Sequence, residues 1–327
     1  MTGDPVTRSA PALDSQTLAA VREDAAAVLA QLRRVYQGPE HVAELLLTCL
    51  VAGGHLLLEG VPGVAKTTLV KAFAETLDAS FRRVQFTPDL LPGDITGIRI
   101  LDRSTNTFVL RPGPVFAHVV LGDEINRAPA KTQSALLEAM QEGQVTIDGE
   151  TRRLPEPFIV LATQNPVEQE GVYLLPEAQL DRFLMKLTMG YPSADQEAEM
   201  LARHGHGRPS IATTLSTDRI LEMRALAEGV AVSDTIRHYV VGLARATRDH
   251  ASAHLGASPR ASLALMRASR ARAMLQGRDY VHVDDVRRLV EPVFAHRIVL
   301  TSSAVISGVT EDRVIRDVVS SVAWDPA

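Results

Sequence analysis

The chain has 327 residues, of which 46% are hydrophobic and 22% charged, and this is the composition of a globular protein long enough for two domains. Its net charge of −5 gives no general attraction to nucleic acid or to anionic lipid, so neither is favoured as a general partner. The single cysteine, Cys49, excludes an internal disulfide and is typical of a reducing compartment.

The sequence contains no pattern for entry into a membrane. Its most apolar stretch, residues 42–61, is interrupted by glycine, histidine and glutamate, so it predicts a helix, a turn and a strand. Residues 1–15 lack the charged-then-apolar pattern of a signal peptide, and we interpret them as a flexible leader. We therefore expect a cytoplasmic protein without membrane insertion.

Helical and extended patterns alternate after this leader. Apolar residues at helical spacing predict helices over residues 18–36 and 42–52, and the stretch from His55 predicts a strand, a tight turn and a helix over 67–77. Pro129 opens a further helix that ends before Gly143. Four more strands are expected at residues 82–86, 118–122, 158–163 and 183–187. The alternation predicts an α/β fold with a mostly parallel five-stranded sheet between helices.

Two insertions and a helical part complete the expected architecture. Residues 98–101 and 107–110 predict a hairpin, and residues 145–152 predict a second one because an Asp-Gly pair suits a type I′ turn. After residue 192 the pattern is helical and contains no lysine. We place the domain boundary near Gly190, with an α/β core over residues 16–190 and a smaller all-α domain over 191–327.

The turn after the first strand has the composition of a phosphate-binding loop. Its backbone N–H groups and the N-terminus of the next helix would point at an anion. Lys66 would neutralise the β- and γ-phosphates, and the Thr67 hydroxyl would ligate Mg²⁺. Ala65 stands where the pattern G-x-x-x-x-G-K-[ST] has glycine, but alanine can adopt helical backbone angles. The predicted nucleotide-binding residues are Gly60, Val61, Pro62, Gly63, Val64, Ala65, Lys66, Thr67 and Thr68.

Two other apolar strands end in polar residues that suit the same chemistry. Asp123 would hold Mg²⁺ through its water shell, and Glu124 would polarise the water that attacks the γ-phosphate. Gly122, before Asp123, is looser than the usual apolar residue. Asn165 could hydrogen-bond both the γ-phosphate and this water, although an asparagine before proline is by itself more often a turn former.

These signals together resemble the MoxR family of AAA+ ATPases over about residues 35–299. The other segments that carry the resemblance are residues 91–97, 123–129, 133–140 and 176–183. The resemblance implies Mg²⁺-dependent ATP hydrolysis in a hexameric ring, with ATP between neighbouring subunits. The two hairpins resemble the family's helix-2 and pre-sensor-1 insertions, which border the central pore. Residues 35–38 are expected to lie against the adenine.

The resemblance also implies roles for two arginines. Arg182 would be an arginine finger that reaches into the neighbouring subunit's site. Arg260 would be a second sensor that projects from the helical domain, the lid, toward the γ-phosphate. The residues themselves support a helix start at this point, because Ser258 suits an N-cap and Pro259 suits the first turn.

Three functions remain open at this point. The resemblance favours a chaperone that remodels or matures a partner complex, often one needing a metal or cofactor, together with a von Willebrand factor A-type domain protein. A magnesium-chelatase-like motor subunit would use the same ATP-hydrolysing domain. A DNA-translocating ring ATPase is the third. Residues 237–288 hold ten arginines against four aspartates, but a solvated helix face and inter-subunit ion pairs explain these. Aromatic residues for base stacking make up only 4% of the chain.

Overall fold

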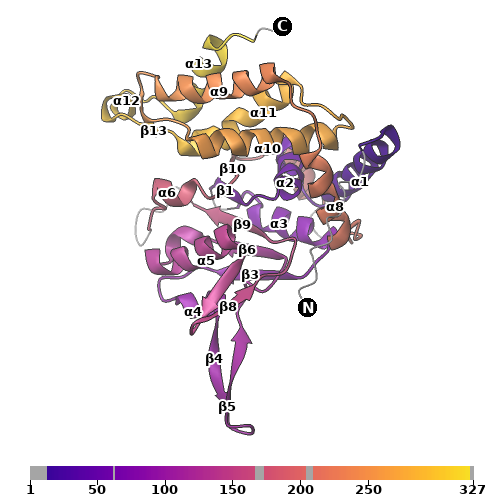
Figure 1. Ribbon diagram of the computed structural model, residues 1–327, viewed down its shortest axis with the longest axis vertical. Coiled ribbons are helices and arrows are strands. Elements are labelled where there is room, and N and C mark those ends of the chain that lie inside the picture. Colours follow the sequence, from indigo (N-terminus) through magenta and orange to yellow (C-terminus); the bar gives the residue numbers. More distant parts are fainter. Residues whose placement is uncertain (1–12, 62, 166–172, 204–208, 325–327) are drawn as a thin grey trace, which may run out of the picture.

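The computed structural model describes residues 13–324, apart from residues 62, 166–172 and 204–208. Its centre is a parallel five-stranded sheet in the order β10-β1-β9-β6-β3 (Figure 1). The strands are β1 (Leu56–Gly60), β3 (Phe81–Gln85), β6 (Val119–Asp123), β9 (Ile159–Gln164) and β10 (Met185–Met189). Each predicted strand is present within two residues of its expected position, which confirms the α/β fold.

Successive residues of the central strands face two different hydrophobic cores. Leu56 and Leu58 belong to a core shared with three helices and the C-terminal helical part, whereas Leu57 belongs to a second core on the other face. These three helices are α1 (Ser15–Arg33), α2 (Glu40–Val51) and α3 (Lys66–Glu75). The second core is covered by α5 (Ala130–Glu142). Burial on both faces explains why the strands are continuous apolar runs in the sequence.

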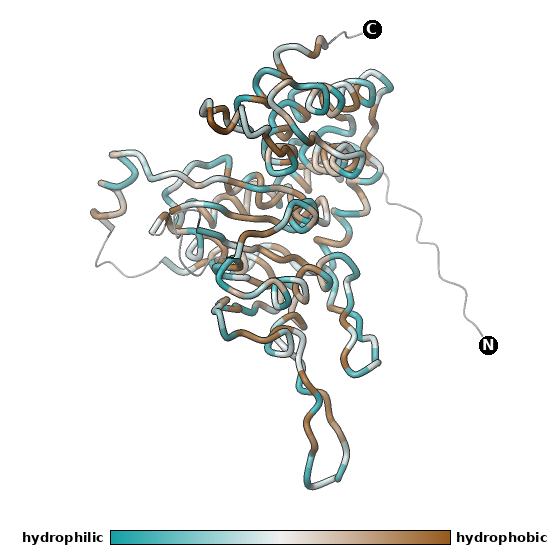
Figure 2. The backbone as a smooth tube through the Cα atoms, turned by 90° about the vertical axis from the view of Figure 1, so that its left-hand side faces the viewer, coloured by the Kyte–Doolittle hydropathy of each residue, from teal (hydrophilic) through white to brown (hydrophobic). Residues whose placement is uncertain are grey.

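Both predicted hairpins form. The longer one pairs β4 (Gly97–Asp102) with β5 (Thr107–Pro112) after the short helix α4 (Pro92–Thr96), and the other pairs β7 (Gln144–Ile147) with β8 (Glu150–Arg153). Asp148 and Gly149 have φ angles of 49° and 84°, which agrees with the expected type I′ turn. Figure 2 shows that the longer hairpin carries apolar segments well away from the core, and Phe108 is 61% exposed.

The C-terminal part is helical and packs along the β10 edge of the sheet. Its helices are α7 (Ala194–Arg203), α8 (Thr217–Glu228), α9 (Asp234–Arg248), α10 (Pro259–Leu275), α11 (Val283–Phe294), α12 (Ser302–Ile306) and α13 (Glu311–Ser321). The short pair of β2 (Leu77–Asp78) with β11 (Leu215–Ser216) links this part to the core, and β12 (Ala253–Leu255) pairs with β13 (Val299–Leu300) within it. None of the helices described here has the length and apolar character needed to cross a membrane.

Local capping explains several helix starts. The hydroxyl of Ser258 accepts a hydrogen bond from the N–H of Ala261 at 3.2 Å, and Pro259 is the first residue of α10, as predicted. Asp14 caps α1 in the same way, so this helix begins at Ser15, the last residue of the predicted leader. Residues 1–12 of the leader lie outside the described part. The domain boundary near Gly190 stays a prediction.

His55 is buried just before β1 and is held neutral. The N–H of Val160 donates to its Nδ1 at 2.9 Å, and its Nε2 lies 3.0 Å from the carbonyl oxygen of Met140. Because Nδ1 accepts, Nε2 carries the proton and donates it, so only the neutral ring satisfies both partners. Burial lowers the pKa of His55 to about 4.

We expect His55 to make the fold sensitive to mild acid. The ordinary pKa is 6.5 and the folded value about 4, so between these pH values the unfolded chain binds a proton that the folded chain excludes. The stabilisation is therefore complete above the ordinary pKa and is lost as the pH falls, by about 3 kcal/mol in total. Urea unfolding of wild type and of His55→Gln at several pH values measures this loss. Parallel stability profiles for the two proteins would contradict the prediction.

Candidate active site

The predicted phosphate loop connects the end of β1 to the start of α3. Gly63 has a φ of 87° and Ala65 a φ of 62°, so both lie in the left-handed region. For Ala65 this differs from the helical angles that we expect from its sequence, and it costs an alanine roughly 1 kcal/mol. The surrounding fold imposes the conformation despite this local cost. Pro62 lies outside the described residues.

Lys66 and Thr67 form the first turn of α3. The Lys66 ammonium donates to the carbonyl oxygens of Gly60 and Val61, the latter at 3.1 Å, and so lies over its own loop. The Thr67 hydroxyl lies 3.2 Å from Oδ2 of Asp123. The loop, the helix N-terminus and the end of β6 therefore meet at the carboxyl edge of the sheet. A lysine and a helix N-terminus at one place make an anion-binding site.

Asp123 is the buried acid of this site, with a side chain only 7% exposed. The Thr163 hydroxyl donates to its Oδ1 at 2.6 Å, and Arg83 donates to its Oδ2 from Nη2 at 2.6 Å and from Nε at 3.1 Å. With Thr67 beside it, the carboxylate offers the oxygen donors that a hard divalent cation prefers. The sequence did not point to Arg83 or Thr163.

Glu124 follows Asp123 with left-handed backbone angles, φ 57° and ψ 50°. Its Oε2 accepts a hydrogen bond from Nε2 of Gln85 at 2.9 Å and lies 3.0 Å from Nε of Arg127, at the end of the short helix η1 (Ile125–Arg127). Its N–H donates to the Thr163 hydroxyl at 2.9 Å. Thr163 thus connects both acids to β9, while Gln85 and Arg127 hold the Glu124 carboxylate.

The glycine before Asp123 has a packing reason. A Cβ at Gly122 would lie 3.3 Å from Cε2 of Phe86 and 3.4 Å from Cδ2 of Leu136. The Phe86 ring is fully buried beside this strand. The apolar side chain usual at this position is therefore supplied by Phe86, which follows the neighbouring strand β3.

Asn165 lies directly after β9 and is 5% exposed. Its carbonyl oxygen accepts a hydrogen bond from Nδ2 of Asn126 at 3.1 Å. Because β6 and β9 are paired in parallel, with Gly122 opposite Ala162, their ends lie side by side. The structure therefore brings Asn165 to the same edge as Asp123 and Glu124, and its contact with a phosphate stays a prediction.

Arg182 and Arg260 lie near the start of β10, at the opposite end of this strand from the phosphate loop. Arg182 precedes β10, whose first residue Met185 pairs with Leu56, the first residue of β1. A strand of five residues, about 15 Å, separates this end from the phosphate loop. Nη1 of Arg260 lies 3.7 Å from Oδ2 of Asp181. Arg260 therefore lies against the segment that precedes β10, and its expected projection toward a γ-phosphate stays a prediction.

Arg297 fastens the segment around Arg182 to the lid. It ends the short helix η2 (Ala295–Arg297), and its side chain is 4% exposed. Its Nε donates to Oδ1 of Asp181 at 2.6 Å, and its Nη2 donates to the carbonyl oxygens of Asp181 at 3.1 Å and Phe183 at 2.7 Å. The buried guanidinium is compensated by a carboxylate and by carbonyls, which a buried charge requires.

A cavity of about 190 Å³ adjoins the phosphate loop. Residues 35–38, predicted to lie against adenine, form one of its walls, and Val64, Ala65 and Met189 are among the others. The Tyr36 hydroxyl is buried without a hydrogen-bond partner in the described part of the chain, and burial raises its pKa to about 12. A largely apolar slot beside a phosphate loop suits a flat base.

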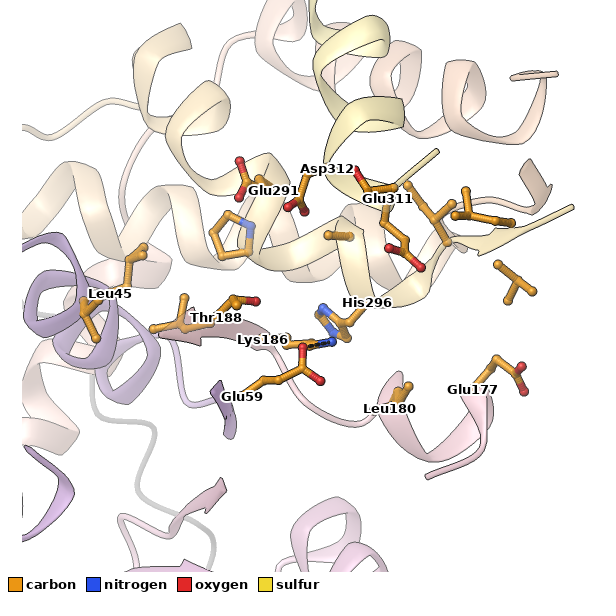
Figure 3. A pocket seen from close by; sticks show the side chains of 18 of the residues that line it. Leu45, Glu59, Glu177, Leu180, Lys186, Thr188, Glu291, His296, Glu311 and Asp312 are labelled. Carbon is orange, nitrogen blue, oxygen red and sulfur yellow. Dashed lines mark ion pairs between the residues drawn. The ribbon is translucent and has the colours of Figure 1, made fainter. Parts of the chain in front are cut away.

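A larger cavity of about 670 Å³ lies between the core and the lid (Figure 3). On the core side, Glu59 pairs with Lys186 at 2.5 Å, and Glu291 and Asp312 lie on the lid side of the cavity. Burial raises the pKa of Glu291, and the nearby Asp312 adds to this effect. Because its walls come from both parts, any movement of the lid changes the shape of this cavity.

Comparison with known proteins identifies the family. Residues 55–185 match the family described as "ATPase family associated with various cellular activities (AAA)", and residues 245–318 match the AAA lid domain. The chain is 44% identical over 323 residues to "Chaperone MoxR1" of Mycobacterium tuberculosis, covering 96% of this chain and 86% of that one. The chain belongs to the MoxR family of AAA+ ATPases. The predicted family and ATPase activity are thereby confirmed.

Other members of the MoxR family and a solved structure agree. The uncharacterized protein YeaC of Bacillus subtilis is 47% identical over 293 residues, covering 89% of this chain and 92% of its own. A crystal structure from Cytophaga hutchinsonii, described as a candidate ATPase, superposes with a TM-score of 0.88 at 39% identity, over 95% of this chain and 97% of that one. The MoxR-type fold with its helical lid therefore extends over almost the whole chain.

Proposed function

We propose that this MoxR-family ATPase forms a ring, hexameric as its family resemblance implies, and uses ATP hydrolysis to remodel or mature a partner complex. The convergence of Lys66, Thr67, Asp123 and Glu124 at one edge of the sheet carries the proposal. A relative named as a chaperone supports the choice of function. A von Willebrand factor A-type protein and a client complex are the proposed partners, in the cytoplasm, where the single buried Cys49 would stay reduced.

The proposed chemistry assigns a task to each residue at this edge. Thr67 and Asp123 would hold Mg²⁺, which supplies positive charge to the β- and γ-phosphates. Glu124 orients the water that attacks the γ-phosphorus, while the bond from that phosphorus to the β–γ bridging oxygen breaks. Asn165 hydrogen-bonds the transferred phosphate. Glu124 must exchange its bonds with Gln85 and Arg127 for the water.

We further propose that Arg182 and Arg260 act on the ATP of a neighbouring subunit. Both arginines lie away from the phosphate loop of their own chain, and the Arg260 side chain is 61% exposed. A cation at this position can stabilise transition-state charge only on a nucleotide supplied by another subunit.

Mixed rings test this division of labour. Arg182→Ala and Glu124→Gln proteins should each be nearly inactive, but a seam with Glu124 from one subunit and Arg182 from the next is intact. Co-assembled mixtures should therefore regain part of the ATPase rate, measured as phosphate release. Mixed assembly is verified by co-purification of differently tagged subunits. If verified mixed rings remain inactive, Arg182 does not act across the seam.

The alternative of a DNA translocase gains no support from the arginines of residues 237–288. Arg267 donates to the carbonyl oxygens of Ala52 and Gly53, and Arg278 pairs with Asp285 at 2.7 Å. The first arginine ties the lid to the core and the second stabilises the lid itself, so both are occupied within the chain. The expected inter-subunit ion pairs stay a prediction. A magnesium-chelatase-like motor subunit would hydrolyse ATP at the same site and would differ in the partner and client on which it acts.

A further inference from the structure

Arg83 is hydrogen-bonded to Asp123, the acid that we assign to Mg²⁺ binding. It lies on β3, the outer strand of the sheet, opposite Leu121 of β6. Both of its donors to Asp123 reach the same oxygen, Oδ2, at 2.6 Å and 3.1 Å. This is also the oxygen nearer to the Thr67 hydroxyl, at 3.2 Å against 3.4 Å for Oδ1. The guanidinium therefore lies where a cation shared by Thr67 and Asp123 would be attracted.

We propose that Arg83 is an internal cation that competes with Mg²⁺ for Asp123 and so sets the Mg²⁺ concentration at which the enzyme binds ATP. This inference rests on the proposed roles of Thr67 and Asp123. The two cations neutralise the same carboxylate, so occupancy by one weakens the attraction for the other. Arg83 can leave toward solvent because its side chain is 43% exposed, whereas Asp123 is 7% exposed and cannot follow it.

The same arginine also reaches the acid assigned to the attacking water. Its Nη2 donates to Oε1 of Gln85 at 2.7 Å, and Nε2 of Gln85 donates to Glu124 at 2.9 Å. An arginine requires an acceptor and a carboxylate requires a donor, so these two partners together determine which way the Gln85 amide faces. When Arg83 leaves Asp123, Gln85 loses the group that orients it toward Glu124. Arg83 thereby links the metal-binding acid to the water-activating acid.

Nucleotide binding at graded Mg²⁺ concentrations tests the competition. The full-length protein is mixed with a fluorescent, non-hydrolysable ATP analogue, and the half-saturating Mg²⁺ concentration is measured. Arg83→Met, which keeps the length of the side chain but has no donors, should lower this concentration about three- to tenfold. Arg83→Lys keeps the charge and should stay closer to wild type. The matched control is Arg82→Met, because Arg82 is exposed and its Nη1 donates to the Phe81 carbonyl oxygen, at 3.4 Å, rather than to Asp123.

The outcomes separate this inference from the proposed function. An unchanged Mg²⁺ requirement in Arg83→Met overturns the competition, and a raised one shows instead that Arg83 supports Asp123. In both cases a wild-type protein that depends on Mg²⁺ leaves the roles of Thr67 and Asp123 intact. A wild-type protein that binds the analogue equally well without Mg²⁺ overturns both. Circular dichroism and thermal melts verify that the variants fold, which the exposed position of Arg83 on an outer strand favours.

Discussion

Replacing Glu124 by glutamine will stop ATP hydrolysis while leaving ATP bound. Glutamine keeps the size of the side chain, but its neutral amide is too weak a base to activate water, so we expect a loss of at least about 100-fold in kcat. The phosphate loop and Asp123 are untouched, so the dissociation constant for ATP should change little. Phosphate release measures the first effect, and fluorescence titration with an ATP analogue measures the second.

A second glutamate provides the control for this result. Glu138 is exposed on α5, and Glu138→Gln removes the same charge from the same chain without touching the site. This variant should hydrolyse ATP at the wild-type rate. Normal turnover in Glu124→Gln would remove Glu124 as the residue that activates the water.

Replacing Lys66 by alanine will abolish ATP binding. The ammonium lies over the loop, where it donates to the carbonyls of Gly60 and Val61, so its loss removes both a charge for the phosphates and a brace for the loop. A charged hydrogen bond contributes about 1.5–3 kcal/mol, and with the loop disturbed we expect affinity to fall by more than about 100-fold.

The matched control is the second lysine of the same helix. Lys71 lies further along α3 beside a cavity that does not include the phosphate loop, so Lys71→Ala should bind ATP like the wild type. Titration of both variants with an ATP analogue under identical salt distinguishes a specific contact from a general loss of positive charge. Unchanged affinity in Lys66→Ala would refute the phosphate loop.

The parts of this site that were predictable are those encoded by neighbouring residues. A strand, a glycine-containing turn and a helix start follow one another from His55 to Thr68, and Asp123 comes at the end of its own apolar strand. The Asp148–Gly149 turn and the cap at Ser258 are equally local. Such signals depend on backbone preferences over a few residues, so the sequence displays them directly.

The parts that were not predictable depend on which strands become neighbours. Arg83 and Gln85 meet Asp123 and Glu124 only because β3 lies beside β6, and no local pattern encodes this order. The start of α10, the helix that carries Arg260, was predicted correctly. The direction in which the Arg260 side chain points depends on how the lid packs along β10. The left-handed angles of Ala65 were also hidden, because an alanine in the sequence gives no indication of a positive φ.

The hydrogen bonds of Arg297 to the segment around Arg182 have a mechanical consequence. Arg297 holds carbonyl oxygens on both sides of Arg182, together with the carboxylate of Asp181, so η2 and Arg182 cannot shift independently. A movement of the helical part is therefore transmitted to the segment that carries Arg182. With Arg182 acting on a neighbouring subunit's ATP, as we propose, a client that pulls on the lid of one subunit would alter the rate of ATP cleavage in the next subunit.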